Sequence, residues 1–159
     1  MPTRNSKIEI EVSIAARGKS IRNGWRFEYK STSEYVDKTT GDITIPTRAG
    51  EQTLVFILAT PFIAWGTHES DRFALSLQLG RRSNGNDVLS IWREGNPEKP
   101  HPSAAFSYPA LSRDNKGRDN VTTTNYNLTA GSYRYCLTFG LMLGGGRILK
   151  IDNDPRIKN

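Results

Sequence analysis

Residues 128–139 read Leu-Thr-Ala-Gly-Ser-Tyr-Arg-Tyr-Cys-Leu-Thr-Phe and carry the clearest indication of architecture in the chain. The stretch has the pattern of a turn followed by a strand in which apolar and polar residues alternate. Leu128, Gly131 and Tyr133 have the spacing of a tyrosine corner, in which a tyrosine near the start of a strand bonds back to the upstream backbone and fixes a loop between two sheets. The motif predicts a β-sandwich.

The same alternation recurs along the chain. Segment 7–14 is strictly alternating, and segment 24–30 places Trp25, Phe27 and Tyr29 on one face. The continuous apolar run at 52–59 predicts a central strand that is covered on both faces. Further strands are expected at 43–45, 73–79, 88–92, 104–108, 121–128, 132–143 and 147–151, with 104–108 and 121–128 at sheet edges.

Turn signals such as Asn84-Gly85 separate these segments, and no segment has a convincing helical period. Segments 60–72 and 112–120 are expected to be loops. With about eight to ten short strands, the sequence predicts an all-β protein. We expect an antiparallel Greek-key β-sandwich of the immunoglobulin-like kind, with a jelly roll as the second choice. The length predicts a single domain over 1–159, with short polar tails at 1–6 and 152–159.

Composition narrows the cellular setting and the class of partner. The formal net charge is +6 and the isoelectric point is about 9.6, which favours anionic partners. The longest apolar run, 54–59, is too short to cross a bilayer, and the first residues have no apolar signal-peptide core. We therefore expect a cytoplasmic protein without membrane insertion. The single cysteine, Cys136, excludes an internal disulfide and is interpreted as a structural free thiol.

Motifs for metal binding and catalysis are weak. The segment Asp114–Asp119 places a lysine at a ligand position of a calcium loop and lacks the closing glutamate, so we interpret it as a solvated loop. His68 and His101 are the only histidines, which is too few for a recognisable zinc site, and no Gly-x-Ser-x-Gly motif is present. The sequence predicts no metal site and no cofactor. It favours a non-enzymatic protein while leaving catalysis open.

One loop carries residues suited to a ligand. Trp65 lies in the expected loop 60–72, close to His68, Glu69 and Asp71. An exposed tryptophan can stack on a sugar ring, and neighbouring polar side chains can bond to hydroxyl groups. These four residues are the candidate ligand-binding site, and a carbohydrate or peptide would suit them.

The end of the chain resembles known small proteins. An Asp154-Pro155 pair in segment 152–157 follows the glycine-rich turn 144–146 and the tyrosine-corner strand. This arrangement resembles the small bacterial DP-EP family and, more distantly, the AidA/PixA inclusion-body proteins, although the chain has no Glu-Pro dipeptide. The resemblance implies a compact bacterial β-sandwich without an established biochemical activity, and it carries over no catalytic residue.

Three hypotheses about function follow. The first is a non-enzymatic β-sandwich that acts by surface binding or self-association, in which an edge strand such as 121–128 pairs in a homo-oligomer. The alternative is a carbohydrate-binding module or lectin that uses Trp65. The second alternative is a binder of polyanions or nucleic acids, for which the net charge is the reason.

Overall fold

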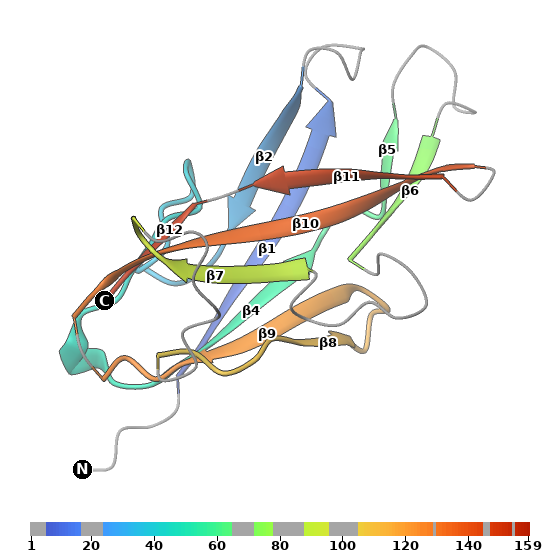
Figure 1. The fold of residues 1–159 in the computed structure, drawn as a ribbon. Coiled ribbons are helices and arrows are strands. Elements are labelled where there is room, and N and C mark those ends of the chain that lie inside the picture. The colour runs from blue at the N-terminus through green and yellow to red at the C-terminus, as the bar shows by residue number, and fades with distance from the viewer. Residues whose placement is uncertain are drawn as a thin grey trace.

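The computed structural model describes residues 6–16, 24–64, 72–77, 88–95, 105–128, 130–144, 147–153 and 155–159. These residues form twelve strands and one 3₁₀ turn, η2 (Thr47–Ala49), and the strands make two sheets that face each other (Figure 1). The predicted all-β sandwich is confirmed. The finer immunoglobulin-like or jelly-roll connectivity stays a prediction.

The first sheet has five strands. Their order is β2 (Trp25–Lys30), β1 (Ser6–Ala16), β4 (Gln52–Leu58), β9 (Asp119–Asn125) and β8 (Ala110–Arg113). The apolar run in β4 is buried along both faces, since Leu54 and Phe56 join the core while Val55 and Ile57 on the opposite face are only 7% and 5% exposed. The prediction of a covered central strand is correct.

The second sheet is organised around β10 (Ser132–Gly144), the long strand that crosses Figure 1. The path through this sheet is β3 (Ile43–Thr44), β12 (Arg156–Lys158), β10, β6 (Arg72–Ser76) and β5 (Phe62–Ala64), and β7 (Leu89–Arg93) and β11 (Arg147–Asn153) also pair with β10. Alternate β10 side chains enter the core, as the sequence period predicts: Tyr133, Tyr135, Leu137, Phe139 and Leu141.

Aromatic side chains join the two sheets at the core. The rings of Phe56 on β4 and Tyr135 on β10 have centroids 5.0 Å apart, and Phe106 meets Tyr133 edge to face at 4.9 Å. Ring pairs at such separations stabilise a core beyond the area that they bury. The tyrosines of β10 therefore anchor one sheet on the other.

The sheets are mixed, which corrects the expectation of a purely antiparallel sandwich. Strand β1 pairs with β4 in parallel, and β12 pairs with β3 in parallel. Parallel neighbours need a crossover connection of a dozen residues or more. The chain between β1 and β4 is long enough because it includes β2 and β3 before it returns.

Of the two predicted edge strands, the one at 121–128 is wrong, and the one at 104–108 is reduced to a single bridge. Strand β9, expected at an edge over 121–128, lies between β4 and β8 and ends at Asn125. Of the expected edge strand 104–108, the described part makes one isolated bridge, from Phe106 to Asn125. The strands that end the five-stranded sheet are β2 and β8.

Three strands lie where the sequence suggested irregular chain. Strand β5 occupies part of the expected loop 60–72, and the end of β8 and the start of β9 occupy the two ends of the expected loop 112–120. Strand β12 forms inside the expected polar tail, where Ile157 is fully buried between β3 and β10. Such short strands carry little periodicity of their own, because their pairing partners rather than their patterns hold them in the sheet.

Candidate binding surfaces

The β8–β9 hairpin turn is fixed by one aspartate. One carboxylate oxygen of Asp114 accepts hydrogen bonds from the backbone N–H groups of Lys116 (3.0 Å) and Arg118 (2.8 Å). The backbone N–H of Gly117 donates to the carbonyl of Asp114 at 3.0 Å, with Gly117 at a φ of +75° that favours glycine. The segment interpreted as a solvated loop is thus an ordered turn.

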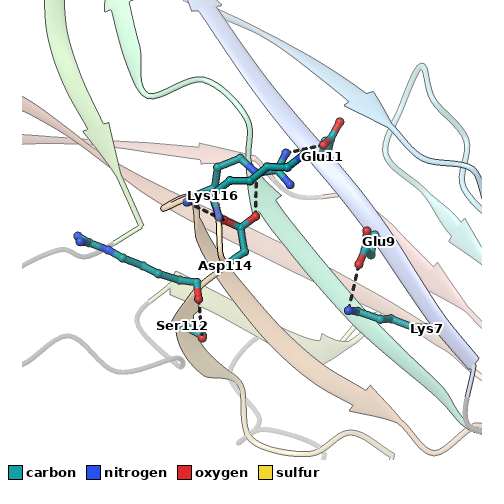
Figure 2. Close-up of polar contacts among 8 residues, drawn as sticks. Lys7, Glu9, Glu11, Ser112, Asp114 and Lys116 are labelled. Atoms are coloured by element: carbon teal, nitrogen blue, oxygen red, sulfur yellow. Dashed lines mark hydrogen bonds and ion pairs between the residues drawn. The ribbon is translucent and has the colours of Figure 1, made fainter.

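Arg118 connects this turn to a strand on the far side of β4. Its Nε lies 2.8 Å from an oxygen of Asp114, and its Nη1 lies 2.6 Å from an oxygen of Glu11 on β1. Figure 2 shows Glu11 and Asp114 on either side of this contact. Strands β1 and β9 lie on either side of β4, so the arginine side chain crosses β4. Ile57 of β4 pairs with Glu11 of β1, and its side chain is only 5% exposed.

The contacts shift the acidity of both partners. The pKa of Asp114 is lowered, first by the backbone N–H of Arg118 and then by the guanidinium and the N–H of Lys116, which outweigh the opposing effect of burial. The pKa of Arg118 is raised by the hydrogen bonds from its guanidinium to Glu11 and Asp114. Arg118, Asp114 and Glu11 therefore form a group of paired charges across the sheet, which we call the charged clasp.

Asp119 joins the two sheets beside this clasp. One of its oxygens accepts hydrogen bonds from the Ser76 hydroxyl (2.9 Å) and the Leu77 backbone N–H (3.1 Å), at the end of β6. The other oxygen accepts from Nε of Arg113 at 3.0 Å. Asp119, the first residue of β9, thereby connects the first sheet to β6 of the second sheet.

A cleft of about 470 Å³ lies between the hairpin and the ends of β4 and β6, and its walls include Arg113, Lys116 and Arg118. Asp119 pairs with Arg113, while Asp114 and Glu11 pair with Arg118. These acids offset the cations, so the cleft itself does not favour an anion strongly. The polyanion hypothesis gains no support from it.

A second groove, of about 460 Å³, runs along β2. Five consecutive residues of this strand, 25–29, line it together with the turn 38–40 and Asn153 at the end of β11. Successive side chains of a strand point to opposite faces, so a groove on one face would be lined by every second residue. Residues 25–29 are consecutive and come from both faces, so we infer that the groove follows the edge of β2. The turn opposite is ordered, since Asp37 accepts hydrogen bonds from the backbone N–H groups of Thr39 and Thr40.

Strand β2 presents a different chemistry on each face. Trp25 and Phe27 are half-buried against the core and Tyr29 is buried, so the predicted aromatic face is confirmed. Arg26, Glu28 and Lys30 are exposed on the other face. Arg26 and Glu28 lie 3.6 Å apart, with side chains 65% and 67% exposed. The exposed face thus carries charges of alternating sign.

The four candidate ligand residues, Trp65, His68, Glu69 and Asp71, lie outside the described residues. The carbohydrate-site hypothesis therefore stays a prediction. His101 lies outside the described residues as well.

The three residues of the predicted tyrosine corner occupy contrasting environments. Tyr133 lies near the start of β10 and is 1% exposed, whereas Leu128 is 77% exposed. Gly131 lies under the Tyr133 ring, since a Cβ atom there would be 3.1 Å from a ring carbon. The hydrogen bond that defines a tyrosine corner stays a prediction.

Other site expectations can be placed on the fold. The Cys136 side chain is half-buried, with Sγ 3.9 Å from the Thr138 hydroxyl. In the part of the chain that the structure describes, no three His, Cys, Asp or Glu side chains gather as a metal site would require. No helix among the same residues is long and apolar enough to span a membrane.

Sequence reasoning missed the charged residues of both surfaces. Arg118 and Glu11 are far apart in the chain, and no periodic signal links them. The alternation of Arg26 and Glu28 in β2 is visible in the sequence, but its meaning depends on β2 being the last strand of its sheet.

The chain has a distant likeness to a solved structure. No family model matches the chain, and no curated protein matches it. A solved structure, described as an inclusion body protein (PixA) from Burkholderia cenocepacia, covers 99% of this chain and 98% of its own, with 5% identity and a TM-score of 0.47. The chain is thus similar to a protein of the PixA inclusion-body group that the end of its sequence resembles.

Proposed function

We propose that the protein is non-enzymatic and acts by self-association, through the outer edge of β2. The observation that carries this proposal is the position of β2: it ends the five-stranded sheet, and a groove follows its edge. The last strand of a sheet is a template on which another strand can add.

The opposite end of the sheet is a weaker candidate. Strand β8 has four residues, and its last residue, Arg113, is held by Asp119. Strand β2 has six residues and presents half-buried aromatic side chains at the groove. A longer strand with apolar surface to cover gives an added strand more backbone hydrogen bonds and more buried area.

Self-association can be tested by sedimentation equilibrium of the whole chain over a wide range of protein concentration. We expect a reversible dimer whose fraction increases with concentration. A monomer mass at every concentration would contradict the proposal.

Hydrogen exchange locates the contact. We expect the backbone amides of β2 to exchange more slowly at high protein concentration, while those of the interior strand β4 keep their rate. Concentration-dependent protection confined to β8 would place the interface at the wrong edge and contradict the assignment to β2.

A further inference from the structure

We infer that two copies of the chain pair their β2 strands antiparallel about a two-fold axis, with Phe27 of one copy opposite Phe27 of the other. This inference rests on the proposed self-association and names its geometry. A two-fold interface uses the same patch on both copies, so one strand must be complementary to itself. The sequence Trp-Arg-Phe-Glu-Tyr-Lys in β2 has that property in this register.

The charges match in this register. With Phe27 at the axis, Arg26 of each copy lies directly opposite Glu28 of the second copy, and the symmetry makes this ion pair twice. Lys30 lies opposite Gly24, which has no side chain. Opposite charges directly across antiparallel strands are stabilising, and like charges there are destabilising.

Neighbouring registers fail on charge or on side-chain orientation. Placing Glu28 at the axis sets two carboxylates against each other and Arg26 against Lys30. Placing Arg26 at the axis sets two guanidinium groups against each other. A slip by one residue brings the aromatic face of one strand onto the charged face of the other. The pattern of β2 thus selects one pairing among its neighbours.

The aromatic face gains cover in the same register. Trp25 lies opposite Tyr29, and the two Phe27 rings meet at the axis. In the protomer Trp25 and Phe27 are only partly buried, and Phe27 packs against Phe139 with ring centroids 6.2 Å apart. A second strand in the groove would extend this aromatic cluster across the interface.

The existing contact between Arg26 and Glu28 does not oppose dimerisation. Both side chains are about two-thirds exposed and 3.6 Å apart, which is the geometry of a surface ion pair that stabilises little. The two residues can exchange this contact for pairs with the second copy at small cost.

Charge exchange tests the register. We expect Arg26→Glu to weaken the dimer by about tenfold or more, since it faces two carboxylates against each other at both symmetric positions. Glu28→Arg should do the same. The double variant R26E/E28R restores opposite charges in this register and should return the dissociation constant to within about threefold of the parent chain.

Two controls separate the register from general charge effects. The exchange K7E/E9K reverses an ion pair of 3.0 Å on the same face of the sheet but on interior strand β1, and should leave the dimer unchanged (Figure 2). Lys30→Ala should also leave it unchanged, because Gly24 is its counterpart. Thermal unfolding of each variant confirms that the fold survives.

Cross-linking gives an independent readout of the axis. In a Cys136→Ser background, Phe27→Cys should form an intermolecular disulfide, since residues directly opposite in an antiparallel pair have Cα atoms within disulfide range. Glu28→Cys should not, because the two copies of residue 28 are offset along the strands. The reverse result would overturn the register.

The outcomes distinguish the inference from the proposal beneath it. A parent chain that stays monomeric contradicts both. A parent dimer that single charge reversals leave unchanged, or that the double variant fails to restore, overturns the register while self-association stands.

Discussion

The phenolic hydroxyl of Tyr135 donates a 2.6 Å hydrogen bond to the backbone carbonyl of Gly41, inside the protein. The bond ties the central strand β10 to the turn that follows β2. That turn is closed on itself, since the backbone N–H of Asp37 donates to the carbonyl of Asp42 and that of Gly41 donates to the carbonyl of Asp37, both at 2.8 Å. One tyrosine thus positions the wall of the β2 groove.

Replacing this hydroxyl should cost stability. Tyr135→Phe leaves the buried Gly41 carbonyl without its donor, and we expect a loss of about 1–3 kcal/mol in the free energy of unfolding, measured by urea denaturation. Tyr108→Phe, at a tyrosine that is largely exposed, is the matched control and should change stability by less than about 0.5 kcal/mol. Equal effects of the two substitutions would contradict the importance of the buried bond.

The same residue gives a pH dependence. Burial, followed by the nearby Tyr29 and Asp42, raises the pKa of Tyr135 well above its usual value. Because the folded pKa exceeds the unfolded pKa of about 10, the contribution to stability is complete below pH ~10 and is lost as the pH rises through the folded pKa. The stability difference between the parent chain and Tyr135→Phe should therefore shrink in alkaline urea titrations, and a constant difference would contradict the shift.

A glycine pair separates steric clash from backbone strain. Gly41 and Gly117 have nearly equal positive φ values, +79° and +75°, but a Cβ at Gly41 would lie 2.5 Å from the Tyr29 ring while one at Gly117 meets nothing within 4 Å. We expect Gly117→Ala to destabilise by about 1–2 kcal/mol through strain alone. Gly41→Ala should lose about 1–3 kcal/mol more because the ring must move. Equal melting temperatures for the two variants would refute the close packing.

Removing the clasp arginine should change the acidity of its aspartate. In Arg118→Met, the pKa of Asp114 should rise toward its ordinary value, because the guanidinium that helps to lower it is removed while the backbone N–H groups of residues 116 and 118 remain. A lowered folded pKa stabilises the protein above the unfolded value, and this contribution is lost as the pH falls through the folded value. Carboxyl NMR titration measures the shift, and Lys7→Met, at the separate pair with Glu9, should leave it unchanged.

The contribution of Asp119 to the contact between the sheets should be measurable in the stability of the protein and in the exchange rate of the Leu77 amide. Asp119→Ala removes the acceptor for Ser76, Leu77 and Arg113, and we expect a loss of about 2 kcal/mol, since hydrogen bonds to a charged group are among the stronger ones. The Leu77 amide should also exchange faster. Asp152→Ala, at an exposed carboxylate bonded by the Thr138 hydroxyl, is the control with an expected change below about 0.5 kcal/mol. An unaltered Leu77 exchange rate would argue against the link.

The predicted tyrosine corner has its own test. If the Tyr133 hydroxyl bonds to the upstream backbone, Tyr133→Phe should destabilise by about 1–2 kcal/mol while the ring still fills the core. Leu128→Ala should have little effect because that side chain is largely exposed. A Tyr133→Phe variant as stable as the parent chain would show that the ring alone holds this position.

Local pattern was enough to place the long strands. The alternation at β1, β2 and β10 follows from the two-residue period of a strand, so the segments that meet the core could be recognised without knowing their neighbours. The continuous apolar run of β4 indicated a central strand because both of its faces are covered. These segments carry enough apolar periodicity to establish an all-β chain.

The alternation of apolar and polar residues could not predict which distant segments pair with each other. The short strands β5, β8 and β12 exist because a neighbouring strand supplies their hydrogen bonds, and the parallel contact of β1 with β4 depends on the path of the chain between them. An edge is defined by what lies beside a strand, so β9 was mistaken for one while β2 was not recognised. The contact of Arg118 with Glu11 likewise needs the sheet to bring the two residues together.

The residues alone thus establish the β-rich composition, the inward faces of the long strands and the alternating charges of β2. Strand order, the two parallel pairings, the clasp across β4 and the groove along β2 arise when the sheets assemble. The physical reason is that side-chain periodicity is a local property of a strand, whereas neighbours, edges and grooves depend on contacts between residues far apart in the chain.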